Sequence, residues 1–188
     1  MEKPDEELVV EHLAGNEEAF TLLVKRHLKG IYSFVARLAA EEADDIVQDT
    51  FLKAWKGLRS YDSRSAAFKT WLTRIARNAA IDHLRKKKPL VFSDFGDGTE
   101  DGFPDPEDSE PLPDEAFARA EDAQALEEAL KSLQPLYREV ILLRDMSQLT
   151  FEEMGAVLGA PVNTVRSRYR RGLARMKRLL ESVHQKGM

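Results

Sequence analysis

The sequence has 188 residues and a net charge of −5, and its hydrophobic fraction of 43% excludes wholesale disorder. It contains no cysteine, which excludes disulfides and thiolate metal sites and favours a reducing compartment. The acidic start is not a secretory signal, and no apolar run approaches the ~18 residues that span a membrane, so we expect a soluble cytoplasmic protein without membrane insertion.

Charge is distributed unevenly along the chain. Residues 25–88 and 131–188 have net charges of +8 and +6, whereas residues 89–130 have a net charge of −13. Phosphate binding depends on local basic surface and not on the average charge of a chain. The two basic blocks therefore leave nucleic-acid binding open despite the negative total.

Three helices are predicted in the first 88 residues. Apolar residues recur every three or four positions from Phe20 to Leu38, the period of one helix face, and Asn16 is placed to cap this helix. Two more helices are predicted at residues 43–58 and 67–87. The residues expected to face inward are Phe20, Leu23, Val24, Leu28, Ile31, Val35 and Leu38 in the first helix, Val47, Phe51, Ala54 and Leu58 in the second, and Phe68, Leu72, Ile75, Ala76, Ala79 and His83 in the third.

The second predicted helix has an apolar residue on its polar face. Leu52 lies opposite the inward face, among Asp45, Gln48 and Asp49, and Trp55 lies at the edge of this face. Single exposed leucines are common. A neighbouring tryptophan gives the mixed composition of a docking surface, so the pattern alone leaves both interpretations open.

The third predicted helix combines basic and aromatic residues. Basic side chains interleaved with rings suit single-stranded nucleic acid, because unstacked bases stack on the rings while arginines follow the backbone. We prefer core packing for Phe68 and His83. For Trp71, core packing and stacking on nucleic acid are about equally well supported. One face of this helix carries Thr70, Arg74, Arg77, Ile81 and Arg85, with Asn78 beside it and Trp71 at its border.

Residues 89–113 contain five prolines, three glycines and no basic residue. Such a composition buries too little apolar surface to offset its ordering entropy, so it predicts a flexible acidic linker. The chain is thereby divided into an N-terminal domain at residues 1–88 and a C-terminal domain at residues 114–188. Twenty-five linker residues can extend to ~80 Å, enough to separate the two domains widely.

Helices are predicted in the C-terminal domain near residues 114–132, 135–145, 150–158 and 161–181. Thr150 and Glu153 have the spacing of a capping box. Gly159 can end that helix with a positive φ, and Pro161 suits the first turn of the next one. Two helices joined by so short a turn are typical of a helix-turn-helix. Because no run alternates with period two, we predict an all-α protein with two small helical domains.

The last predicted helix is strongly basic. It carries no acid between Thr164 and Arg178, and its apolar residues form one stripe from Val162 to Leu180. Arginine forks match guanine edges and phosphate oxygens, at ~1–3 kcal/mol of discrimination per good base contact. A charge run is usually only a solvated face, but the capped helix and turn in front of it favour a DNA-reading helix.

These segments together resemble bacterial RNA polymerase sigma factors of the extracytoplasmic-function (ECF) branch. Residues 44–55 (DDIVQDTFLKAW) are similar to the family's core-polymerase-binding helix, and residues 68–78 (FKTWLTRIARN) to its promoter-melting and −10 segment. Residues 136–143 and 161–168 are similar to its −35-element domain. The segments follow the family's order and cover nearly all of the chain outside the linker.

The resemblance implies a non-catalytic promoter-recognition protein without a cofactor or metal ion. Its expected partners are promoter DNA, an anti-sigma factor and the RNA polymerase core, where it docks on a coiled coil of the largest subunit. Asn163 stands where the family usually has glycine, and Tyr169 where it usually has a smaller aliphatic residue. The implied site residues are Asp45, Gln48, Asp49, Leu52 and Trp55 for the polymerase; Ser63, Arg64, Ser65, Lys69, Thr70, Trp71, Arg74, Arg77, Asn78 and Arg85 for single-stranded −10 DNA; and Asn163, Thr164, Arg166, Ser167, Arg168, Arg170 and Arg171 for the −35 duplex.

Two other classes of protein compete with this interpretation. A stand-alone helix-turn-helix regulator would normally bind a palindrome as a dimer, yet nothing here resembles a dimer zipper or a ligand domain. A nuclease would need clustered carboxylates, whereas Asp44, Asp45 and Asp49 lie on the apparent docking face. The stand-alone regulator remains the alternative to a sigma factor.

Overall fold

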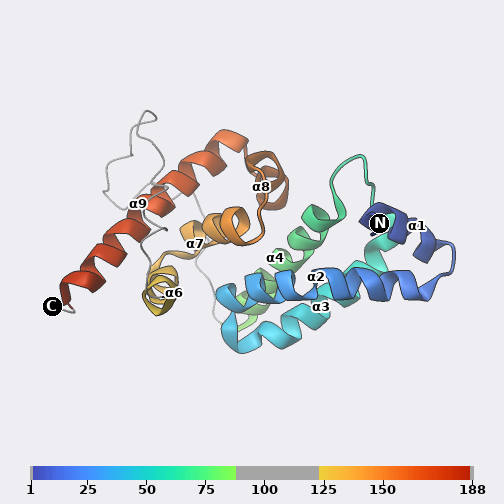
Figure 1. The fold of residues 1–188 in the computed structure, drawn as a ribbon, viewed down its shortest axis with the longest axis horizontal. Coiled ribbons are helices and arrows are strands. Elements are labelled where there is room, and N and C mark those ends of the chain that lie inside the picture. The colour runs from blue at the N-terminus through green and yellow to red at the C-terminus, as the bar shows by residue number, and fades with distance from the viewer. Residues whose placement is uncertain (1, 88–122, 187–188) are drawn as a thin grey trace.

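The computed structural model describes residues 2–87 and 123–186, and within these ranges it contains helices and no strand (Figure 1). The all-α prediction is therefore confirmed. The predicted linker at residues 89–113 lies outside the described residues, as does the start of the helix predicted near residue 114.

The N-terminal domain consists of four α-helices and two short 3-10 turns. Asn16 caps the second helix as predicted, because its side chain accepts a hydrogen bond from the N–H of Glu18 at 3.1 Å. The first helix was not predicted; its signals are Pro4 followed by three acids, which suit the start of a helix. The elements are α1 (Asp5–Leu13), α2 (Glu17–Leu38), η1 (Ala40–Glu42), α3 (Ala43–Gly57), η2 (Leu58–Ser60) and α4 (Phe68–Lys87).

The residues predicted to face inward are buried or partly buried in all three helices, with one exception on α2, and further residues of α3 and α4, among them Ile46, Thr50 and Thr70, are buried as well. Leu28 was expected to face inward, but it is 44% exposed. Phe34, absent from the predicted face, is one of the largest fully buried side chains. The reason is that α2 packs on α1, α3 and α4 at different points along its length, so its buried face is wider than one stripe.

The C-terminal domain packs short helices against one long helix. Arg138 ties the first two together, because its guanidinium donates to the carbonyls of Leu130 and Leu133 at the end of α6. The helix that begins at Pro135 continues into a π-helical turn. The elements are α6 (Ala123–Ser132), α7 (Pro135–Ile141), the π turn η4 (Leu142–Met146), α8 (Phe151–Leu158) and α9 (Val162–Lys186).

The helix-turn-helix forms with the predicted signals in place. The hydroxyl of Thr150 accepts from the N–H of Glu153, whose carboxylate accepts from the N–H of Thr150 at 2.8 Å. Gly159 ends α8 with a φ of 65°, and α9 begins directly after Pro161. Glycine also suits position 155, because a Cβ there would lie only 3.0 Å from the carbonyl oxygen of Ala160 in the turn.

The two domains are in contact with each other in this structure. Helix α4 packs along α8, and α2 packs against η4 and α7 (Figure 1). Buried apolar side chains from both domains belong to one continuous core. Helix α1 and the C-terminal end of α9 lie at opposite ends of the molecule (Figure 1).

Candidate nucleic-acid interface and docking face

The polar face of α3 is open to solvent. Leu52 and Trp55 are 49% and 52% exposed, and Asp45 and Gln48 are exposed beside them. Asp49 is partly buried and pairs with Lys53, at 2.9 Å between the carboxylate and the ammonium. The structure thus brings the five predicted docking residues to one helix and leaves its apolar pair uncovered.

An aromatic cluster supports the loop before α4. The ring of Trp71 packs on those of Tyr61 and Phe68, at centroid distances of 5.2 and 5.6 Å. Phe68 and Trp71 are both buried, which confirms the core role of Phe68 and gives Trp71 the core role as well. Burial and then the nearby carboxylate of Glu6 raise the pKa of Tyr61 to about 12.

The loop itself is anchored from both ends. The Tyr61 hydroxyl donates to the carbonyl of Ala66 at 3.0 Å, and Asp62 accepts hydrogen bonds from the backbone N–H and the guanidinium of Arg64. These bonds lower the pKa of the Asp62 carboxyl. Ser63, Arg64 and Ser65 therefore stand exposed on an ordered turn, where they can meet a ligand without first being arranged.

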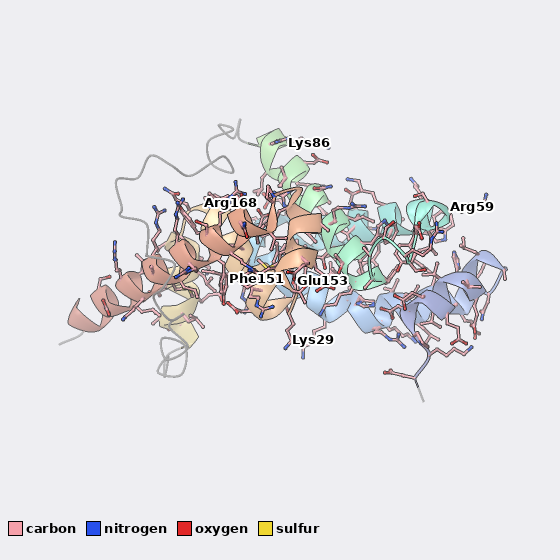
Figure 2. All side chains as sticks on the ribbon, turned by 90° about the horizontal axis from the view of Figure 1, so that it is seen from above. Lys29, Arg59, Lys86, Phe151, Glu153 and Arg168 are labelled. Carbon is pink, nitrogen blue, oxygen red and sulfur yellow. The ribbon has the colours of Figure 1, made fainter. Side chains whose placement is uncertain are left out.

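Helix α4 does not present the open polar face that the helical wheel predicts. Thr70 is only 2% exposed, and its hydroxyl donates to the Glu153 carboxylate of α8 at 3.0 Å. Figure 2 labels Glu153 where α8 meets the N-terminal domain. Arg77 is likewise turned into the interface, whereas Lys69, Arg74, Asn78 and Arg85 are exposed. The expectation of one continuous exposed face is wrong, because the C-terminal domain covers part of it.

The partner of Arg77 is Glu139 of α7. The guanidinium donates twice to this carboxylate, at 2.5 and 3.2 Å, and the Glu139 side chain is 2% exposed. Burial raises the pKa of Glu139, although the charge of Arg77 opposes the shift. This pair was not predicted from the sequence. Its signal was a single carboxylate inside the apolar run 136–143, which must find a partner when it is buried.

The N-terminal part of α9 keeps its candidate residues near the surface. Asn163 and Arg166 are exposed, whereas Val165 between them is fully buried. The guanidinium of Arg166 lies 5.4 Å from the centroid of the Phe151 ring and 3.5 Å from a carboxylate oxygen of Glu152. The remaining candidates are partly buried: Thr164, Ser167, Arg168, Arg170 and Arg171.

Tyr169 has a structural role at the base of this helix. It is buried, its hydroxyl donates to Asp145 of η4 at 2.9 Å, and its ring meets the edge of Phe151. Burial raises the pKa of Asp145 despite this hydrogen bond. The tyrosine thereby fixes α9 against α8 and η4. Arg175 also packs within the domain, 4.1 Å above the ring of Tyr137.

Two parts of the chain match sigma-factor families. Residues 23–89 match sigma-70 region 2, and residues 123–176 match sigma-70 region 4. The ECF RNA polymerase sigma factor SigW of Bacillus subtilis is 32% identical over 182 residues, which cover 90% of this chain and 92% of that protein. The chain belongs to the ECF RNA polymerase sigma factors.

Other relatives of this ECF sigma factor are similar over comparable lengths. SigM of Mycobacterium tuberculosis is 35% identical, covering 95% of this chain and 86% of its own length. The ECF sigma-E factor of Salmonella typhimurium is 35% identical, and the match covers 87% of each chain.

Two solved structures are similar to this sigma factor over most of its length. CnrH in complex with the cytosolic domain of CnrY has a TM-score of 0.66 and 27% identity, covering 95% of this chain and 97% of that one. RpoE of Bartonella quintana in complex with the anti-sigma factor NepR has a TM-score of 0.65 and 29% identity, covering 86% of this chain and 96% of that one.

The part of the chain that the structure describes was searched for metal sites and membrane spans. Within residues 2–87 and 123–186, no group of three or more histidines, cysteines, aspartates or glutamates is placed to hold a metal ion. Among the helices described, none is both long and apolar enough to cross a bilayer.

Proposed function

We propose that this sigma factor binds the RNA polymerase core, recognises the −10 and −35 elements of promoters and promotes promoter melting. The observation that carries the proposal is that two helices and one loop of the same chain present three different surfaces. Helix α3 has an exposed docking face, and the loop before α4 carries ordered polar side chains. Helix α9, the second helix of the helix-turn-helix, has a basic face. The proposed domains are residues 1–88 and 114–188, joined by the acidic linker at residues 89–113.

The polymerase-binding role is assigned to the exposed face of α3. A partly apolar patch with acids at its rim has the composition of a protein interface, where a few large side chains contribute most of the affinity. Leu52 and Trp55 are those side chains here, and Asp45, Gln48 and Asp49 form the rim. The partner is a coiled coil of the largest polymerase subunit.

The −35 duplex is assigned to the first turns of α9. Base contacts of a helix-turn-helix come from the N-terminal part of its second helix, where Asn163, Thr164 and Arg166 lie. Arg166 is held over Phe151, so part of its conformational entropy is lost before any DNA arrives. Ser167, Arg168, Arg170 and Arg171 complete the −35 set.

Single-stranded −10 DNA is assigned to the loop before α4 and to α4 itself. Ser63, Arg64 and Ser65 stand on the anchored loop, where they can surround an unstacked base. Trp71 supports this loop from the core. The residues proposed to follow the strand along α4 are Lys69, Thr70, Arg74, Arg77, Asn78 and Arg85.

An anti-sigma factor is the further partner we assign to this protein. Support comes from the similar structures, of which one holds an anti-sigma factor and the other the cytosolic domain of CnrY. The chain is a recognition subunit without catalytic chemistry of its own. It acts in the cytoplasm, where polymerase and chromosomal DNA are found.

Binding to the polymerase core tests this assignment with a matched pair of variants. Leu52→Asp should reduce co-purification with core enzyme at least tenfold, because a charge replaces the centre of the apolar patch. Leu22→Asp is the control, since Leu22 on α2 is also 49% exposed but lies outside the docking face. Equal core binding by the two variants, with unchanged helical content, would show that the docking face is misassigned.

A further inference from the structure

The C-terminal domain covers α4 at the residues that we assign to −10 DNA. Thr70 is 2% exposed and the Arg77 side chain 16%, and each donates to a carboxylate of the other domain. The exposed residues of α4 around them leave only a fragmented surface for a nucleic-acid strand. A strand cannot follow α4 through these two positions while the domains stay in contact.

The carboxylates of Glu139 and Glu153, which cover α4, resemble nucleic acid in their hydrogen-bonding oxygens. Arginine binds carboxylates and phosphates alike, through two parallel N–H···O bonds. Arg77 makes this double contact with Glu139, and Thr70 donates its hydroxyl to Glu153. Two carboxylates of the C-terminal domain thus occupy positions on α4 that phosphate or base oxygens would take.

We propose that the C-terminal domain inhibits −10 recognition within the same chain, with Glu139 and Glu153 standing in for DNA on α4. The inference rests on the proposed DNA-binding role of α4. In this closed form Thr70 and Arg77 contact Glu153 and Glu139. Both residues must exchange these carboxylates for nucleic acid before the promoter is opened.

The closed form leaves the polymerase-docking face free. Leu52 and Trp55 on α3 are about half exposed, so the polymerase core can bind before the domains separate. Asn163 and Arg166 on α9 are also exposed. Docking on the core therefore comes first, and the release of α4 follows it.

The polar contacts of the closed form can break reversibly, and buried apolar side chains of both domains pack beside them. A buried ion pair gains little over its desolvation cost, so separating Arg77 from Glu139 into water or onto DNA is not prohibitive. Arg37 and Glu127 add a partly exposed pair between α2 and α6, at 3.2 Å, and such pairs contribute little. In contrast, removing the Glu139 carboxylate alone leaves the partly buried guanidinium of Arg77 without this partner, which should favour opening.

A reversible cross-link tests the closed form directly. The natural chain has no cysteine, so Arg37→Cys and Glu127→Cys together provide one unique pair across the domain contact, outside every proposed DNA or polymerase residue. A short bismaleimide with a disulfide in its spacer locks the domains, and a reductant releases them. Each single-cysteine variant, treated in the same way, is the control for modification itself.

Transcription with added core enzyme on sheared genomic DNA is the first measurement. The locked protein should co-purify with core enzyme as the released protein does, but should give at least tenfold less transcript. Equal transcription by the locked and released forms would overturn the inhibition while leaving the sigma function intact. Absence of transcript with the locked, released and natural proteins, all bound to core, would overturn the proposed function and with it this inference.

Glu139→Gln tests the role of the carboxylate without polymerase. Its binding to a fluorescent pool of random single-stranded 20-nucleotide DNA should strengthen about tenfold over the natural chain, because a partly buried Arg77 that has lost its carboxylate partner disfavours closure. Glu128→Gln makes the same charge change on an exposed part of α6 and should have little effect. Adding Arg77→Ala to Glu139→Gln should remove the gain. Equal DNA binding by Glu139→Gln and Glu128→Gln would overturn the proposal that the Glu139 carboxylate occupies the place of DNA on α4.

Discussion

Replacing Gly155 with alanine tests how tightly the helix-turn-helix is built. A Cβ at this position would lie 3.0 Å from the carbonyl oxygen of Ala160 and 3.6 Å from a methyl group of Val162. The first contact is with backbone. It has little room to move, because Ala160 donates its N–H to the carbonyl of Gly155 at 3.2 Å and Pro161 follows it.

Gly30 supplies the matched control for this substitution. It lies in the middle of α2, where a Cβ would meet nothing within 4 Å. Alanine in place of glycine in a helix interior is worth ~1 kcal/mol through propensity alone. At Gly155 the same gain is opposed by overpacking that typically costs ~1–3 kcal/mol. Gly30→Ala should therefore stabilise the protein by ~1 kcal/mol, and Gly155→Ala should destabilise it by up to ~2 kcal/mol.

Urea unfolding followed by circular dichroism measures both changes. Gly155→Ala should also weaken promoter use through the −35 element, because relief of the contact requires α8 and α9 to move apart. The reasoning is refuted if Gly155→Ala stabilises the protein as much as Gly30→Ala does.

Two further predictions concern α9 and the aromatic cluster. Arg166→Ala and Arg171→Ala should each cost ~1–3 kcal/mol of −35-dependent promoter recognition if the side chain contacts a base edge; unchanged promoter preference in mapped transcripts would remove that residue from the −35 site. Tyr61, with its pKa raised to about 12, should contribute stability that is complete below about pH 10 and is lost as the pH rises through 12. Urea midpoints should therefore fall more between pH 9 and pH 11.5 in the natural chain than in Tyr61→Phe, and equal falls would contradict this role.

The helix-turn-helix could be predicted from sequence because its signals are local. Thr150 and Glu153 are three residues apart, and the capping box between them needs no distant partner. Gly159 adopts the positive φ that glycine tolerates best. The same holds for Asn16 at the start of α2.

The candidate site on α4 was predicted less well because its surroundings are set by distant residues. A helical wheel places Thr70 and Arg77 on a polar face but carries no information on what packs there. Their partners Glu153 and Glu139 are 83 and 62 residues away. Glu139 in its apolar run signals that a partner is needed, but many basic residues in the chain could have supplied one.

Transcription reconstituted from purified parts tests the central claim most directly. Core RNA polymerase, this protein and a genomic DNA library are combined, and the transcript starts are mapped. The sigma-factor account predicts starts that depend on both proteins and share −10 and −35 sequences upstream, with little sequence-specific binding by the chain alone. Tight, sequence-specific binding to a palindrome without polymerase, and no starts that depend on the added chain, would contradict it.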